Sequence, residues 1–222
     1  MDIVLTAVEA RVLGALIEKS ITTPEYYPLT LNSLTAACNQ KSNRDPTTSL
    51  ADTAILDALD SLRAKRLAWQ TAAAEARVPK YRHDVTTVVP FTPQELALIC
   101  ELLLRGPQTV GELRTHALRL CPLPDLAAVE TALNNLATRP DGPFVVRLPR
   151  ESGRREPRFA HLLCGPVSVE AAAPAAVPVT TTPAPDRMAA LEAEVAALRK
   201  DVEALKLRLG EPSAESPDPG GP

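Results

Sequence analysis

The sequence predicts a mainly α protein with small β-hairpins, which is an α+β fold class. Aromatic residues make up only 3% of the 222 residues, while leucine, alanine and valine dominate, and this composition favours packed helices over a large sheet. An order of three helical patterns followed by a hairpin pattern occurs twice along the chain. Apolar residues spaced three and four apart near the C-terminus indicate one further helix, of the coiled-coil type.

The first predicted helix begins at Thr6. Thr6 and Glu9 have the spacing of a capping box, in which each side chain bonds the backbone N–H of the other residue. Apolar residues at helical spacing carry the helix to about Ser20. Pro24 and Pro28 then remove backbone donors and hold the residues before them extended, so the chain enters the second helix from an extended segment.

The second helix is predicted to begin at Thr30 and to end in the turn-forming run NQKSNRDP, residues 39–46. The third is predicted from about Thr47 to Arg66, with a single apolar face. After it, Leu67–Thr71 and Lys80–Asp84 have the character of two short strands around a tip of small residues. Three helices closed by a hairpin form a winged helix, a helix-turn-helix variant in which the hairpin is the wing.

The second repeat follows the same order. Its first helix is capped by Thr92 with Glu95 as the capping-box partner, and its second helix opens at Thr109. In the third helix, Ala132–Leu136 matches Ala58–Leu62 of the first repeat. The closing hairpin comprises Phe144–Leu148, a polar tip and Arg158–Cys164. The first repeat is longer, mostly in the lead-in to its second helix and in the turn after that helix, and such loop elaborations often carry function.

The remainder of the chain changes in composition. The predicted parts are residues 1–88 (first winged-helix domain), 89–165 (second winged-helix domain), 166–186 (a linker rich in Ala, Pro and Thr), 187–209 (a coiled coil) and 210–222 (a disordered tail). The predicted coiled-coil contacts are Met188, Leu191, Val195, Leu198, Val202, Leu205 and Leu209. Valine at a and leucine at d favour a parallel homodimer. The alternative is one amphipathic helix that docks on the modules or frays, because three heptads are marginal alone.

Composition also limits the cellular setting. The formal net charge is -3, and no segment approaches the roughly 18 apolar residues that span a bilayer. The N-terminus has no basic region of a signal peptide, so we expect a cytoplasmic protein without membrane association. The four cysteines show no CxxC pairing and are interpreted as reduced core residues. A zinc site is the weaker alternative, because the three histidines show no ligand spacing.

The sequence contains no catalytic pattern. His83 and His161 fall on predicted hairpin strands and His116 falls on a helix, and none is placed beside a patterned serine, cysteine or carboxylate pair. Glycine-rich phosphate loops are absent from the sequence as well. We therefore predict a non-enzymatic protein with no catalytic residues, no metal site and no cofactor.

Local positive charge predicts a DNA-associated, transcription-regulatory function, in which basic wings contact the phosphates of duplex DNA. The candidate phosphate-contacting residues are Lys41, Asn43, Arg44, Lys80, Arg82, Arg147, Arg150, Arg154, Arg155 and Arg158. The third helices oppose base reading, because the first presents Asp52, Asp57 and Asp60, and the second presents Asp125 and Glu130. For each wing, an ordinary solvated hairpin is the alternative.

The competing hypothesis is a protein-interaction or scaffold module that uses tandem winged helices without binding DNA. Tyr26 and Tyr27, in the extended segment, would suit a partner groove, although covering the core of their own module explains them as well. The turn KSNRDP, residues 41–46, is a candidate for phosphate contact or for partner docking. The sequence leaves open whether the ligand is DNA or protein.

Two segments carry a resemblance to a known family. LTAVEARVLGALIEKS, residues 5–20, and TTPEYYPLTLNSLTAACNQKSNRDP, residues 22–46, are similar to the signature of the YceH family, a bacterial group of uncharacterised function. The resemblance covers residues 2–165. It implies two tandem winged-helix domains and often a C-terminal coiled coil, and it implies neither an enzyme activity nor a known ligand.

Overall fold

The computed structural model describes residues 3–71, 78–150 and 156–167, together with Ala196, Lys200 and Val202. The chain divides into two units, residues 1–173 and 174–222, and both repeats lie in the first unit. The first repeat comprises α1 (Ala7–Thr22), the 3-10 turn η1 (Pro24–Tyr26), β1 (Leu29–Thr30), α2 (Leu31–Cys38), α3 (Asp52–Ala64), β2 (Ala68–Thr71) and β3 (Lys80–His83). After α4 (Val85–Val88), the second comprises α5 (Pro93–Arg105), α6 (Val110–Ala117), α7 (Leu126–Thr138), β4 (Val145–Arg147) and β5 (Phe159–His161).

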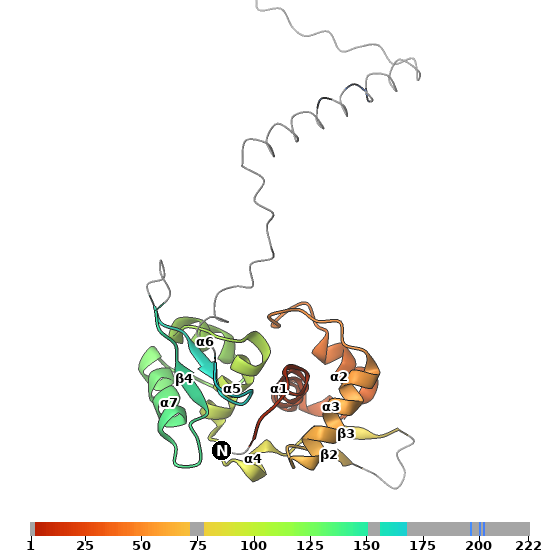
Figure 1. Ribbon diagram of the computed structural model, residues 1–222, viewed down its shortest axis with the longest axis horizontal. Helices are drawn as coiled ribbons and strands as arrows, with labels where there is room; N and C mark the ends of the chain where they lie inside the picture. Colours follow the sequence, from red (N-terminus) through yellow and green to blue (C-terminus); the bar gives the residue numbers. More distant parts are fainter. Residues whose placement is uncertain are drawn as a thin grey trace, which may run out of the picture. The chain divides into compact units, whose positions relative to one another are not determined.

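Helix α1 is the centre of the first unit. Leu13, Leu16 and Ile17 are at most 1% exposed. Figure 1 looks almost along α1 and shows α2 and α3 on one side of it and α5 on the other, in agreement with the contacts between these helices. A helix covered around its circumference is a core element rather than a surface one. The two repeats therefore share one hydrophobic core.

Close contact between α1 and α5 depends on Gly14. A Cβ atom at this position would lie 2.9 Å from Leu104 Cδ2 and 3.1 Å from Leu103 Cβ, which is too close for either side chain. The thiol of Cys100 lies 3.4 Å from the carbonyl oxygen of Gly14. The absence of a side chain thus lets α5 approach the backbone of α1.

The predicted capping boxes are confirmed. The backbone N–H of Thr6 donates to Glu9 at 2.6 Å, and the N–H of Glu9 donates to Thr6 Oγ1 at 3.2 Å. Thr92 and Glu95 form the same pair at the start of α5, at 2.9 and 3.2 Å. Each box satisfies two backbone donors that a helix N-terminus leaves free.

Both predicted hairpins are present as antiparallel strand pairs, β2 with β3 and β4 with β5. β1 was not predicted; it pairs with the other side of β3, so the first sheet has the order β1-β3-β2. Tyr27 belongs to this structure, because its hydroxyl accepts a 2.6 Å hydrogen bond from the backbone of His83. Tyr26 is 72% exposed, so core packing explains only one of the two tyrosines.

Helix α3 begins at Asp52, so the prediction of a start near Thr47 is wrong. The Asn39 side chain forms two hydrogen bonds with the backbone of Leu50, as a paired strand would. Its amide nitrogen donates to the Leu50 carbonyl at 2.9 Å, and its oxygen accepts from the Leu50 N–H at 2.7 Å. Because these bonds occupy the backbone N–H and carbonyl of Leu50, Leu50 cannot form helical hydrogen bonds. Ala51 is also extended (φ -75°, ψ 155°), so the helix begins after it. Helix α1 continues to Thr22, just short of Pro24.

The predicted fold class, mainly helical with two small antiparallel sheets, is confirmed. In the tail, Ala196, Lys200 and Val202 are helical, and Val202 is 49% exposed. The other predicted coiled-coil contacts (Met188, Leu191, Val195, Leu198, Leu205 and Leu209) lie outside the described residues, so dimerisation stays a prediction. None of the described helices has both the length and the apolar character needed to cross a membrane.

Candidate functional site

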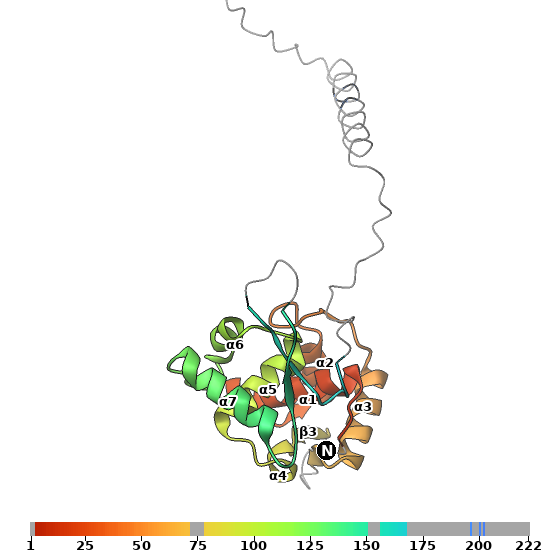
Figure 2. The same cartoon turned by 60° about the vertical axis from the view of Figure 1, so that its left-hand side comes forward.

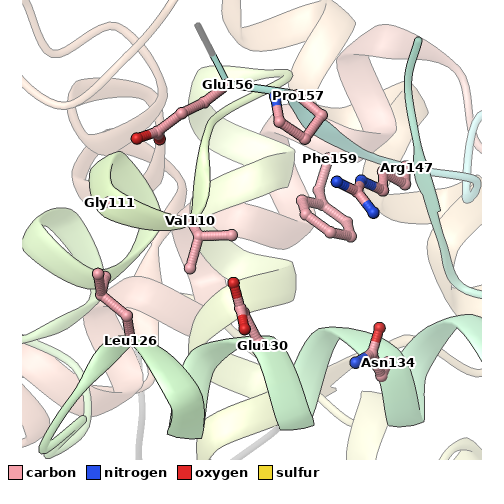
Figure 3. A pocket seen from close by; sticks show the side chains of 9 residues that line it. All are labelled: Val110, Gly111, Leu126, Glu130, Asn134, Arg147, Glu156, Pro157 and Phe159. Carbon is pink, nitrogen blue, oxygen red and sulfur yellow. The ribbon is translucent and has the colours of Figure 1, made fainter. Parts of the chain in front are cut away.

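A groove of about 390 Å³ opens on the surface of the second repeat. Its walls are the N-terminal turn of α6, the exposed face of α7 and the strands β4 and β5; Figure 2 shows these strands running beside α7. The lining residues are Val110, Gly111, Leu126, Glu130, Asn134, Arg147, Glu156, Pro157 and Phe159. Figure 3 shows Glu130 and Asn134 rising from α7 beneath Phe159 and Arg147 of the hairpin.

Local interactions fix each wall. Thr109 caps α6 in a capping box with Glu112, with bonds of 2.8 and 3.2 Å. The Asp125 carboxylate caps α7 by accepting from the Ala128 N–H at 2.8 Å. Gln108 and Phe159 exchange backbone hydrogen bonds of 3.0 and 2.7 Å, which tie β5 to the turn before α6. The groove is therefore formed by rigid elements.

The periodicity of α7 decides which side chains enter the groove. Val129 and Leu133 face the core and are fully buried, whereas Leu126 is 50% exposed. Glu130 and Asn134 are exposed one and two turns further along the helix. Opposite them, a Cβ added to Gly111 would meet no atom within 4 Å, so this glycine leaves the groove open.

The charges in the groove are unequal. Glu130 and Glu156 supply two carboxylates, and Arg147 supplies one guanidinium. Arg158 follows Pro157 and is half-buried. Its positive charge acts on the nearby Glu112: burial favours a higher pKa for that carboxyl, but hydrogen bonds from Thr109 and the charge of Arg158 bring the pKa below its usual value. Because two carboxylates and one guanidinium line the groove, a ligand there would meet apolar surface and a net negative charge.

The structure corrects the prediction for Arg44. Its side chain is 0% exposed, and its guanidinium donates to both carboxylate oxygens of Glu18 and to the carbonyl of Ala37. Asn43, which was also a candidate, donates to Glu18 at 3.1 Å and accepts from Arg105 at 3.1 Å. Arg44 cannot reach a phosphate while the chain is folded, because its donors all point inward.

The turn of residues 41–46 instead joins the two repeats. The N–H of Asp45 donates to the carbonyl of Leu104 in α5 at 3.0 Å. Arg119 bridges Glu18 and Glu101 at 2.7 and 2.6 Å, so both buried carboxylates have a cationic partner. Burial alone would raise the pKa of Glu18, but the hydrogen bonds of Arg44 and the charges of Arg44 and Arg119 lower it. The lengthened turn thus holds the two repeats together, and we call residues 41–46 a structural bracket in this sense.

The other candidate phosphate contacts are dispersed. Lys41 is exposed on the turn, and Lys80 is exposed at the start of β3. Arg82 is half-buried and lies 3.5 Å from the Asp84 carboxylate. Arg147 lines the groove and Arg150 is exposed beyond β4. Arg154 and Arg155 lie outside the described residues, and no described contact brings the basic residues of the two hairpins into one surface.

Two of the three histidines, His83 and His116, form side-chain hydrogen bonds. His83 Nε2 lies 3.0 Å from Ser20 Oγ, and the same hydroxyl is placed to donate to the Ile17 carbonyl at 2.8 Å, in which case the imidazole donates to the serine. A general base would have to accept from the serine instead. His116 Nδ1 lies 2.6 Å from the side-chain oxygen of Gln108. Within the described ranges, no three His, Cys, Asp or Glu side chains are grouped as metal ligands.

Comparison with known proteins identifies a family and close relatives. Residues 5–154 match the family described as "Protein of unknown function, DUF480". A UPF0502 protein of Geobacter sulfurreducens is 55% identical over 202 residues, covering 89% of this chain and 91% of the relative. A UPF0502 protein of Aeromonas hydrophila is 50% identical over 217 residues, covering 95% and 99%. No enzyme is named among these relatives.

Proposed function

We propose a function from the geometry of the groove. The chain belongs to the family described as protein of unknown function, DUF480, and that description names no function from which to start. In this proposal the protein is a non-enzymatic interaction module whose repeats are winged helices. The groove binds a segment of a partner protein that presents a basic side chain next to an apolar one. Membership of the YceH family is a narrower statement, and it rests on the resemblance of residues 5–46.

The observation that carries the proposal is the charge of α7. Winged helices that bind DNA usually lay this helix in the major groove. Helix α7 contains no lysine or arginine, and its exposed face presents Glu130, Asn134 and Asn135. The corresponding helix α3 carries three aspartates and Arg63, whose guanidinium is paired with Asp60 at 3.0 Å. Both helices would be repelled by phosphates.

The lining of the groove defines the expected ligand. Leu126, Val110 and Phe159 form an apolar surface that suits a leucine-sized or aromatic side chain. Glu130 and Glu156 flank that surface and would pair with a lysine or arginine of the partner. Because the walls are helices and a tethered hairpin, the groove is preorganised for binding.

The test is a selection of random ten-residue peptides displayed on phage against the full-length protein, followed by affinity measurements on the enriched peptides. We expect those peptides to pair a basic residue with an apolar one. A Cβ at Gly111 meets no atom within 4 Å, so Gly111→Phe places its ring in the groove from an open position and should abolish binding. Glu130→Gln should weaken binding about tenfold.

Asp57→Asn is the matched control, because it removes the same charge from the exposed face of α3, outside the groove. The affinity of this variant for the enriched peptides should equal that of the unchanged protein. The proposal fails if no peptide is enriched, or if the enriched peptides bind the Gly111→Phe variant as tightly as the unchanged protein.

A second candidate is a DNA-associated role. The observation that favours it is the exposure of Lys80, Arg147 and Arg150 on or beside the hairpins, where winged helices contact the DNA backbone. In this version, residues 187–209 pair two chains and so set the spacing of two sets of hairpins. It requires binding to duplex DNA that falls steeply with salt.

A further inference from the structure

A second cavity, of about 280 Å³, lies between the two repeats. One wall is the first two turns of α1, another is the segment from Asp45 to Leu50, and a third is the C-terminal end of α5. His161, at the end of β5, and Cys164, in the chain after it, complete the cavity. This cavity shares no residue with the groove on α7.

Much of the lining is apolar, but the cavity is also lined by a buried cation. Leu50, Leu102 and Leu103 face it, together with Val8. Arg11 lines the same space and is only 5% exposed. Its Nη2 donates to the Pro46 carbonyl at 2.6 Å, whereas its Nη1 has no hydrogen-bond partner among the described residues. A buried guanidinium normally has a carboxylate partner, because desolvating a charge is costly.

The neighbouring charges leave Arg11 incompletely compensated. Burial lowers the pKa of Arg11, and the charge of Arg44 lowers it further, while Asp45 and Glu18 act in the opposite direction. Glu18 is itself committed to Arg44 and Arg119. Asp45 is exposed at the cavity edge, where solvent screens its charge, and it forms no described ion pair with Arg11.

We propose that this cavity binds a small monocarboxylate with an apolar body, whose carboxylate pairs with Arg11 while its hydrocarbon chain packs on Leu50, Leu102 and Leu103. Nη1 is itself covered, so the guanidinium must turn toward the cavity before a carboxylate can supply the acceptor that Nη1 lacks, in a charge-assisted hydrogen bond. Because the cavity lies at the first turns of α1, the helix dipole favours an anion there as well. The volume lies just below the usual range of ligand sites, which restricts the cavity to a small molecule.

His161 contributes a neutral group. Burial lowers its pKa to about 4, so the imidazole carries no charge at neutral pH. Its Nδ1 is buried and has no hydrogen-bond partner among the described residues, so His161 is a second side chain at the cavity with an unmatched polar atom.

Such a ligand would act on the packing of the repeats. α1 belongs to the first repeat, and α5 belongs to the second, so one molecule would touch both. Binding to the folded chain alone raises its free energy of unfolding, and above the dissociation constant this gain grows with the logarithm of the ligand concentration. This inference is independent of the peptide groove and would stand if that proposal failed.

The experiment is isothermal titration calorimetry of the full-length protein with acetate, butanoate, hexanoate and octanoate, and with hexanamide as the uncharged counterpart. We expect affinity to rise from acetate to hexanoate as the chain reaches the leucines, with one site per chain. Arg11→Met keeps the apolar shape and removes the charge, and it should weaken hexanoate binding about tenfold or more. Hexanamide should bind the unchanged protein about as weakly as hexanoate binds the Arg11→Met variant.

Two further variants complete the design. Ala7→Phe narrows the cavity from an exposed position of α1 and should weaken binding even if Arg11→Met folds poorly. Arg63→Met removes an arginine from the surface of α3 and should bind hexanoate like the unchanged protein. Hexanoate should also slow alkylation of Cys164, which lines the cavity, and leave alkylation of the partly exposed Cys121 unchanged.

The inference is overturned if none of the four carboxylates gives saturable binding at millimolar concentration. It is also overturned if hexanamide binds as tightly as hexanoate, or if Ala7→Phe leaves the affinity unchanged, because Arg11 or the cavity would then have no part in binding.

Discussion

Replacing Arg44 with methionine tests whether the turn of residues 41–46 is a structural bracket. The change leaves the Glu18 carboxylate, whose side chain is 2% exposed, without its main partner, and it removes two donors from the Ala37 carbonyl. Removing one partner of a buried ion pair costs about 3–5 kcal/mol. Arg119 still contacts Glu18 at 2.7 Å, so we expect a loss near 3 kcal/mol in the free energy of unfolding.

The assay is equilibrium urea unfolding of the full-length variants. Lys41→Met is the matched control, because it makes the same substitution three residues earlier at an exposed position, and it should change stability by no more than about 0.5 kcal/mol. The double variant Glu18→Leu with Arg44→Met leaves no unpaired carboxylate and should recover part of the loss. If Arg44→Met were as harmless as Lys41→Met, the bracket would not exist and Arg44 would again be a candidate for phosphate contact.

Two further predictions concern pH and assembly. Burial lowers the pKa of His83 and of His161 from 6.5 to about 4. As the pH falls below 6.5, the unfolded chain therefore takes up protons before the folded chain does. The free energy of unfolding should be highest above pH 6.5 and fall by up to about 3 kcal/mol per histidine as the pH drops to 4. His161→Gln should flatten this fall in urea unfolding at several pH values, and an unchanged slope would contradict the assignment. Deleting residues 187–222 should convert a dimer into a monomer in light scattering, and a truncated chain that stays dimeric would show that this segment is not what pairs the chains.

Local signals were sufficient to predict most of the fold. Thr6 with Glu9 and Thr92 with Glu95 fix two helix starts within four residues of sequence, and both boxes form as expected. The start of α3 was not predictable in this way, because Asn39 holds Leu50 in an extended conformation from eleven positions away. Such pairings depend on how the chain folds back, which spacing alone does not contain.

The burial of Arg44 was missed for a similar reason. A turn rich in polar residues is usually exposed, and the partner of Arg44 lies 26 positions earlier, in α1. A signal was present, however. Glu18 and Glu101 each interrupt an apolar helical stretch, and a carboxylate within a buried stripe requires a cation from elsewhere in the chain.

The groove was predictable only in part. Glu130 was recognised as a charged residue of the third helix, but as an obstacle to DNA rather than as part of a binding surface. The role of Gly111 follows from the space opposite α7, which exists only once Phe159 and Pro157 of the hairpin are in place. An exposed Leu126 at the start of α7 was the one local sign of an apolar site.

The most direct test of the proposed function is binding of a fluorescein-labelled, mixed-sequence 24-base-pair duplex to the full-length protein at 50 and 200 mM salt. The charge of α3 and α7 predicts weak binding even at the lower salt concentration, whereas a displayed peptide that pairs a basic with an apolar residue should bind at both concentrations and be lost in Gly111→Phe. Tight duplex binding at 50 mM that falls steeply at 200 mM and survives Gly111→Phe would contradict the account and favour a DNA-associated role.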